Sequence, residues 1–280
     1  MAVAREAHGE QDAAPGESLA EVIDLARYPI LSPESPGYRR LIETARRRLA
    51  ETGACVFEGF MLPGAVARTL AQVAPLAREA FVCSQPHNVY LTDTDPAFPS
   101  DHARNRLVRS VKGVLADDEI PAESPLRVIY GAPLFRAFLC EALEIERLFP
   151  FADRLASINV NFYGENQELG WHFDNAKFAV TLMLRQADAG GAFEFAPNIR
   201  EESDKGFARV ARILDGDPAV VRELKQDPGA LVLFKGSRSL HRVTPSFGDS
   251  PRTIAVLSYV SEPGQGLKEH TRLLFYGRKQ

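Results

Sequence analysis

Two short segments of the chain contain residues that together suit a metal ion. His172 and Asp174 lie two positions apart in the first segment, and His241 follows 69 residues after His172 in the second. Alternate side chains of an extended strand share one face, so His172 and Asp174 point the same way while Trp171 and Phe173 point the other way. Two histidines and one carboxylate, with further coordination positions open, are the ligand set of non-haem Fe(II) oxygenases. This spacing makes His172, Asp174 and His241 candidate metal and catalytic ligands; the alternative is a chance His-x-Asp pair with histidines that are packed or lie at the surface.

A single arginine, Arg252, stands at the start of an apolar stretch, 11 residues beyond His241. An arginine side chain binds a carboxylate through two parallel hydrogen bonds, a geometry that lysine does not reproduce. At the mouth of a β-barrel it would hold the distal carboxylate of 2-oxoglutarate, a chelating co-substrate. Pairing of Arg252 with a surface acid is the alternative.

The overall composition restricts the classes of partner. The 280-residue chain has 33 basic and 37 acidic residues, and its net charge of −4 argues against a nucleic-acid partner. No apolar stretch approaches the roughly 20 residues of a membrane-spanning helix, and the first residues do not resemble an export signal. Cys55, Cys83 and Cys140 are widely spaced, which is typical of reduced thiols. We therefore expect a cytoplasmic protein without a membrane partner.

The hydrophobic pattern predicts a mainly β core with flanking helices. We expect residues 1–18 to form a disordered tail and residues 19–280 to form a single domain. Within this domain we expect a helical part at about 36–150, a β core at about 151–262 and a helical insertion at about 200–228. Helices are predicted near 38–49, 62–81 and 133–145, and strands near 54–60, 157–163, 171–173, 178–184, 192–195, 230–234, 241–244 and 253–260. Closely spaced strands with turn residues between them are typical of a barrel or a sandwich.

Residues 83–111 differ from their surroundings because they contain Pro86, Pro96 and Pro99 and show no sustained periodicity. Loops of this length in a compact domain are often lids or binding segments. We therefore predict a functional loop here.

Four elements in sequence order resemble the Fe(II)/2-oxoglutarate-dependent oxygenase superfamily. They are the His-x-Asp motif, GGAFEF at 190–195, GALVLFKGSRSLHRVTP at 229–245 and PRT at 251–253. The resemblance implies a double-stranded β-helix, the jelly-roll or cupin-like barrel. It also implies Fe(II), 2-oxoglutarate and O2 as cofactor and co-substrates.

Further segments look like the HalD/BesD-type group, which contains radical halogenases and related hydroxylases of free amino acids. The similarity runs from about residue 50 to 262 and includes PHNVYL at 86–91, NVNFYG at 159–164, LGWHFD at 169–174 and FEFAPNIR at 193–200. In halogenases of this group, Gly or Ala replaces the carboxylate ligand, which leaves a coordination position for chloride. This chain keeps Asp174, so the resemblance implies hydroxylation.

A polar amino-acid substrate needs partners for its charges, because an unpaired buried charge is costly. Candidate partners are Asn175, which adjoins Asp174, and polar residues of the segment 83–111, namely His87, Asn88, Arg104, Arg106 and Arg109. Asn161 and Tyr163 share one strand face, from which we expect them to contact 2-oxoglutarate. For the arginines the alternative is a surface position, and for His87 and Asn88 it is a turn.

These observations favour a 2-oxoglutarate-dependent dioxygenase that hydroxylates an unactivated C–H bond of a free amino acid or close derivative, with succinate and CO2 as co-products. One alternative is the same iron centre performing desaturation or acting on another small metabolite. The other is a non-catalytic β-helix protein that binds a metal and a metabolite. The sequence leaves the oligomeric state open.

Overall fold

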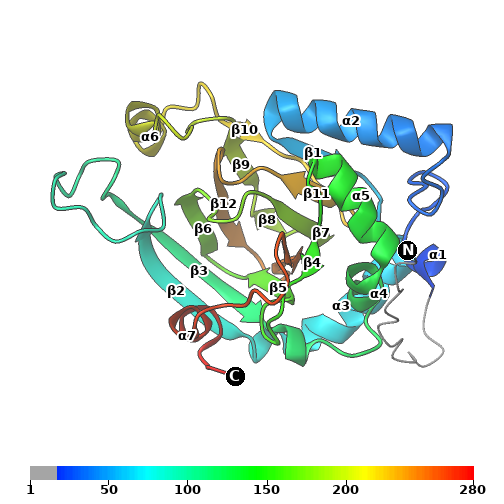
Figure 1. Ribbon diagram of the computed structural model, residues 1–280. Helices are drawn as coiled ribbons and strands as arrows, with labels where there is room; N and C mark the ends of the chain where they lie inside the picture. Colours follow the sequence, from blue (N-terminus) through cyan, green and yellow to red (C-terminus); the bar gives the residue numbers. More distant parts are fainter. Residues whose placement is uncertain (1–17) are drawn as a thin grey trace.

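The computed structural model describes residues 18–280, and a curled sheet of twelve strands forms its centre (Figure 1). The order across the sheet is β1-β11-β7-β13-β5-β3-β6-β12-β9-β10, with β2 added beside β3 and β8 beside β12. The strands are β1 Ala54–Phe57, β2 Phe81–Asn88, β3 Leu107–Leu115, β5 Ile158–Tyr163, β6 Gln167–His172, β7 Ala179–Arg185, β8 Ala189–Gly190, β9 Phe193–Ala196, β10 Arg222–Glu223, β11 Leu231–Phe234, β12 Leu240–Phe247 and β13 Arg252–Leu257. A separate pair joins β4 Phe149–Pro150 to β14 Tyr259–Val260. The mainly β core is thus as predicted, whereas the tail predicted at 1–18 lies outside the described residues except for Ser18.

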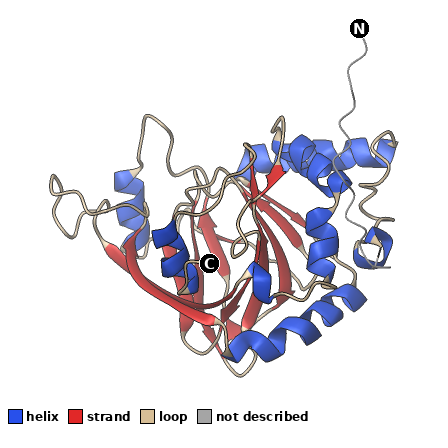
Figure 2. Cartoon of the chain, turned by 60° about the horizontal axis from the view of Figure 1, so that its bottom comes forward, coloured by secondary structure: helices blue, strands red, loops and turns tan. Residues whose placement is uncertain are grey.

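Helices lie on the outside of the curled sheet (Figures 1 and 2). They are α1 Leu19–Val22, α2 Pro36–Thr52, α3 Pro63–Val73, α4 Pro125–Gly131, α5 Pro133–Leu143, α6 Phe207–Leu214 and α7 Glu269–Tyr276, with 3-10 turns at Ala74–Arg78 and Asp117–Glu119. The first five pack beside β1, β7 and β5, and α7 packs against β2 and β3. None of the described helices combines the length and apolar content that crossing a bilayer requires.

Helix α2 shows how local sequence signals set these boundaries. The Ser35 side chain accepts a hydrogen bond from the Tyr38 N–H at the start of the helix, and Pro36 occupies its first turn. Gly53 ends the helix in the left-handed conformation that glycine adopts readily. The buried stripe of α2, which includes Ile42 and Leu49, packs into the main core.

The central strands have two different faces. In β5, Ile158, Val160 and Phe162 point into the core beneath the helices. The alternating residues Asn159, Asn161 and Tyr163 line a cavity on the inner side of the curl. This alternation follows from the two-residue period of a strand, and it brings polar side chains to the inside of an otherwise apolar barrel.

The structure corrects the predicted loop at 83–111. Its two ends, residues 83–88 and 107–111, belong to the paired strands β2 and β3, and the residues between them, 89–106, form the connection. Pro86 is tolerated because β2 pairs only with β3 among the described strands, and proline is compatible with a sheet edge. Two long strands thereby enter the part of the chain predicted to be mainly helical.

Two other local differences concern helix ends and the C-terminal part. The helix predicted at 62–81 ends at Val73 and continues only as a 3-10 turn, because Pro75 lacks the N–H that an α-helix needs. The sequence analysis did not predict α7.

Cys55, Cys83 and Cys140 are free thiols, as predicted.

Candidate metal centre

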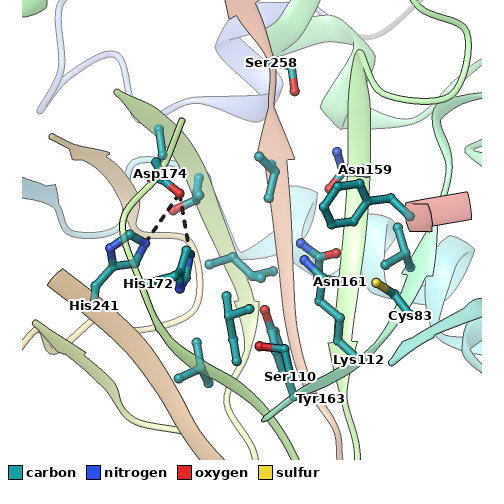
Figure 3. A pocket seen from close by; sticks show the side chains of 18 of the residues that line it. Cys83, Ser110, Lys112, Asn159, Asn161, Tyr163, His172, Asp174, His241 and Ser258 are labelled. Carbon is teal, nitrogen blue, oxygen red and sulfur yellow. Dashed lines mark ion pairs between the residues drawn. The ribbon is translucent and has the colours of Figure 1, made fainter. Parts of the chain in front are cut away.

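The three predicted metal ligands meet at one end of the inner cavity. β6 and β12 pair so that His172 and His241 lie opposite each other, and Asp174 follows the end of β6. The Nε2 atoms of both histidines lie 3.6 Å from Asp174 Oδ1 (Figure 3). All three donor atoms lie within 4.8 Å of one another, which is close enough for one ion to bind all of them.

Hydrogen bonds fix both imidazole rings in the form that binds metals. The Nδ1 atom of His172 lies 2.9 Å from the carbonyl oxygen of Gly170, and Nδ1 of His241 lies 3.0 Å from that of Ser239. A carbonyl oxygen only accepts hydrogen bonds, so Nδ1 carries the proton and Nε2 offers a lone pair. Both Nε2 atoms therefore face Asp174 as free donors.

The electrostatics of the cluster keep the His172 ring neutral and the Asp174 carboxyl group ionised. Burial lowers the pKa of His172 to about 4, and the nearby His241 ring acts in the same direction. Burial by itself raises the pKa of Asp174, but His241 and His172 outweigh it and hold that pKa well below its ordinary value. At neutral pH the site thus presents a neutral ring and a carboxylate, which fit a divalent cation.

Acidification is expected to destabilise the metal-free protein between about pH 6.5 and pH 4. The pKa of His172 is about 4 in the folded state, against an ordinary value of 6.5, so the unfolded chain binds a proton at a higher pH. Stability that depends on the neutral ring is complete above about pH 6.5 and is lost as the pH falls toward 4. Thermal unfolding midpoints across this range test the effect. The midpoint of His172→Gln should depend less steeply on pH, and an unchanged slope would contradict the assignment.

Gly236 leaves the space that the Asp174 carboxylate occupies. The backbone N–H of Asp174 donates to the Gly236 carbonyl at 3.0 Å, and a Cβ added at Gly236 would overlap Asp174 Oδ2. A side chain at this position must therefore push the carboxylate away from the two histidines.

Gly236→Ala is accordingly expected to weaken metal binding by about 10- to 100-fold, the usual effect of disturbing what orients a ligand. Titration of the metal-free protein with Fe(II) or Ni(II) measures this affinity. Gly131→Ala is a matched control, because an added Cβ at Gly131 meets no atom within 4 Å. Equal affinities in the two variants would show that Gly236 is not needed for the ligand geometry.

The inner cavity has a volume of about 380 Å³ and extends from the three ligands to Arg252 and onward to α7. Arg252 is only 2% exposed, and its Nε donates to the Gly191 carbonyl at 3.0 Å. Neither Nη1 nor Nη2 has a hydrogen-bond partner within residues 18–280. Burial lowers the pKa of Arg252 to about 10, so the side chain remains charged at neutral pH. Two unpartnered donors on a buried cation fit the distal carboxylate of 2-oxoglutarate.

Gly191 helps to aim this guanidinium group. Its φ of +64° favours glycine, and a Cβ there would lie 2.8 Å from Ser246 Oγ and 3.2 Å from Arg252 Cδ. Gly191, the second glycine of GGAFEF, thus leaves space for the aliphatic part of the Arg252 side chain.

Asn161 and Tyr163 both line the cavity, as their shared strand face predicted. Asn161 Oδ1 is buried without a hydrogen-bond partner among the described residues. The Tyr163 ring centre lies 5.8 Å from the Arg252 guanidinium carbon. Both residues are therefore placed to contact a ligand held by Arg252.

His87 also lines the cavity, next to the metal ligands. Its Nδ1 lies 3.0 Å from the Asn88 carbonyl oxygen and its Nε2 lies 2.6 Å from Ser110 Oγ. Ser110 Oγ accepts a hydrogen bond from the Gly170 N–H at 2.9 Å, and the Gly170 carbonyl in turn accepts from His172. A hydrogen-bonded chain thus connects His87 to a metal ligand.

Five other predicted substrate contacts are not among the residues that line the cavity. Asn175 is exposed, because the chain turns away after Asp174. The Asn88 side chain stabilises its own turn through the Thr92 carbonyl and the Tyr90 N–H. Neither residue lines the cavity, and the contacts of Asn88 fit the alternative of a turn.

Two of the three arginines of this segment pair with acidic side chains and do not line the cavity. Arg109 lies on the outer face of β3, bound to Glu168 Oε1 at 2.9 Å, and Arg106 pairs with Asp215. Arg104 is half-buried near Tyr90 and does not line the cavity, but its buried Nη1 has no hydrogen-bond partner within residues 18–280. The carboxylate clamp therefore stays a prediction for Arg104, whereas Arg106 and Arg109 are engaged by acidic side chains.

Apart from His87, the sequence analysis missed the residues that β2 and β3 contribute to the cavity. The inward-facing residues of these strands are Cys83, Gln85, His87, Ser110, Lys112 and Val114. The β-rich run LVRSVKGVL at 107–115 was the signal that could have identified the second strand. Reading this run as a strand would have placed Lys112 on the same face as Ser110.

Comparisons with known proteins agree with this geometry. A model of the Halogenase D family matches residues 40–271. Among solved structures, AviO1 from Streptomyces viridochromogenes Tue57 has a TM-score of 0.53 and 17% sequence identity, with 80% of this chain and 96% of that chain covered. No curated protein sequence matches the chain.

Two further solved structures share the fold. The non-heme alpha ketoglutarate dependent epimerase SnoN from nogalamycin biosynthesis has a TM-score of 0.53 and 16% identity, over 79% of this chain and 81% of that chain. A prolyl hydroxylase from Trichoplax adhaerens, in complex with a hypoxia inducible factor peptide, has a TM-score of 0.51 and 14% identity, over 79% of this chain and 90% of that chain. These likenesses confirm the predicted fold class, a double-stranded β-helix with flanking helices.

Proposed function

The chain belongs to the Halogenase D family of Fe(II)/2-oxoglutarate-dependent oxygenases, and on this premise we propose that it hydroxylates a free amino acid or a close derivative. The observation that carries this proposal is Asp174. Its carboxylate lies beside His172 and His241 as a third ligand, at the position that Gly or Ala occupies in the family's halogenases. A retained carboxylate leaves no position for chloride at this point of the coordination sphere.

The residues of the chain supply binding and orientation. His172, Asp174 and His241 would hold Fe(II) on one face, and Arg252 would hold the distal carboxylate of 2-oxoglutarate. When bound, iron and 2-oxoglutarate supply the oxidising chemistry, in which O2 provides one oxygen atom to the substrate and one to succinate, with release of CO2. The buried walls of the cavity exclude bulk water and determine which C–H bond of the substrate lies nearest the metal.

Incubation with Fe(II), 2-oxoglutarate and a panel of free amino acids under air tests the proposal. The expected result is succinate formation that depends on one class of amino acid, with a product heavier than the substrate by one oxygen atom. Mass spectrometry distinguishes this product from a desaturated one, which is lighter by two hydrogens, and from a chlorinated one in the presence of chloride. Succinate at the level of the metal-free control across the whole panel would instead favour a non-catalytic binding protein.

A further inference from the structure

Lys112 extends from β3 into the cavity without a partner. It lies between Ser110 and Val114 on the inward face of the strand, and all three residues line the cavity. Within residues 18–280 its ammonium group makes no hydrogen bond or ion pair. Its positive charge reaches the side chains of Cys83 and His87 and lowers their pKa values, although burial raises that of Cys83 overall.

The position of Lys112 places its charge across the cavity from the metal ligands. β3 pairs with β5 so that Val114 lies opposite Asn161, and Lys112 is the next inward-facing residue along β3. Figure 3 shows the side chains of Lys112 and Asn161 pointing into the cavity, on the wall that faces His172, Asp174 and His241. A ligand in the middle of the cavity therefore lies between the metal centre and this wall.

The charges of the cavity are unbalanced even with metal and co-substrate bound. Among the lining residues of 18–280, Asp174 is the only carboxylate, and Lys112 and Arg252 are the only permanently charged cations. A divalent ion and the dianion 2-oxoglutarate cancel each other, and Asp174 balances one of the two cations. One positive charge is left over at the half-buried Lys112, where a bound anion would be attracted more strongly than in bulk water.

The co-substrate has no remaining group for this charge. One end of 2-oxoglutarate chelates the metal, and its distal carboxylate is matched by the two unpartnered nitrogens of Arg252. A carboxylate that pairs with Lys112 therefore comes from a different molecule in the same cavity.

We infer that Lys112 binds the carboxylate of the organic substrate, and that the substrate is an acidic or neutral amino acid rather than one with a cationic side chain. This inference rests on the proposed function. Asn161 Oδ1, a buried acceptor without a partner, is available to the substrate ammonium group. A second cation on the substrate would meet no carboxylate among the lining residues except the metal ligand Asp174. Val114, Val256 and Phe275 offer apolar contacts to a carbon chain.

Binding measurements on the Ni(II)-loaded protein test this inference without turnover. Calorimetry would follow the binding of 2-oxoglutarate first, and then of glutamate, leucine and lysine to the protein loaded with Ni(II) and 2-oxoglutarate. Lys112→Met removes the charge at similar length, Lys112→Arg keeps it, and exposed Lys225→Met is the control. Unchanged Ni(II) affinity shows that each variant retains the folded centre.

The expected result is that Lys112→Met binds the best amino acid about 30-fold more weakly, while its affinity for 2-oxoglutarate changes less than about threefold. Lys112→Arg should recover most of the lost affinity, and glutamate or leucine should bind more tightly than lysine. An equal loss of 2-oxoglutarate affinity would assign Lys112 to the co-substrate and overturn the inference. Tightest binding of lysine, or binding of 2-oxoglutarate but of no amino acid, would also overturn it. If 2-oxoglutarate does not bind the wild-type protein, the proposed function fails as well.

Discussion

Asp174→Ala should reduce hydroxylation by more than about 100-fold. Disturbing the residues that support a metal ligand already reduces affinity or activity by about 10- to 100-fold, so removal of the ligand itself should exceed that range. Without the carboxylate, only the Nε2 atoms of His172 and His241 remain as protein ligands. The negative charge of Asp174 Oδ1, 3.6 Å from each of these atoms, is lost. Quantitation of hydroxylated product and of bound iron measures both effects.

The exposed residue Asp249 provides the control for this variant. Asp249→Ala removes a carboxylate of the same kind at a position that does not line the cavity, and it should leave iron content and product formation unchanged. Hydroxylation by Asp174→Ala at the wild-type rate, with iron bound, would show that Asp174 is not a ligand and would remove the basis for the hydroxylase proposal.

Arg252→Met should raise the 2-oxoglutarate concentration for half-maximal turnover by about 100-fold. The loss of a buried partner from a charge-assisted pair costs about 2–5 kcal/mol, and both terminal nitrogens of Arg252 are free to form such a pair. At saturating 2-oxoglutarate the turnover rate should change much less, because Arg252 does not contact the metal ligands. Initial rates at varied 2-oxoglutarate separate the two parameters.

Arg252→Lys separates charge from geometry at the same position. It retains a cation but not the two-nitrogen fork, so its 2-oxoglutarate requirement should lie between those of wild type and Arg252→Met. Arg147→Met, at a residue whose side chain is 74% exposed, controls for the loss of an arginine elsewhere. An unchanged requirement in Arg252→Met would place the carboxylate anchor at another residue.

The sequence predicted the metal cluster well because the relevant rules are local. The two-residue period of a strand is sufficient to put His172 and Asp174 on one side and Trp171 and Phe173 on the other, and the structure shows this arrangement. Trp171 and Phe173 pack in a separate apolar cluster behind the ligands. His241 and Arg252 were identified for a similar reason, since each begins or nearly begins an apolar strand.

The substrate side of the cavity was predicted poorly because it depends on register. Arg109 and Ser110 are neighbours in the sequence, yet Arg109 pairs with Glu168 outside while Ser110 faces the cavity. A shift of one residue in the register of a strand moves every side chain to the opposite face of the sheet. In addition, the prolines of 83–111 made it difficult to recognise β2 and β3 as strands. Lys112 was overlooked for this reason, since pairing with β5 and β6 cannot be read from local composition.

The end of the chain forms part of the cavity wall, through Leu267 and through Phe275 and Tyr276 of α7. These side chains come from a segment that supplies none of the three metal ligands and packs against β2 and β3. Substitutions at these three positions can therefore make the chamber deeper or shallower without altering the strands that carry the iron ligands.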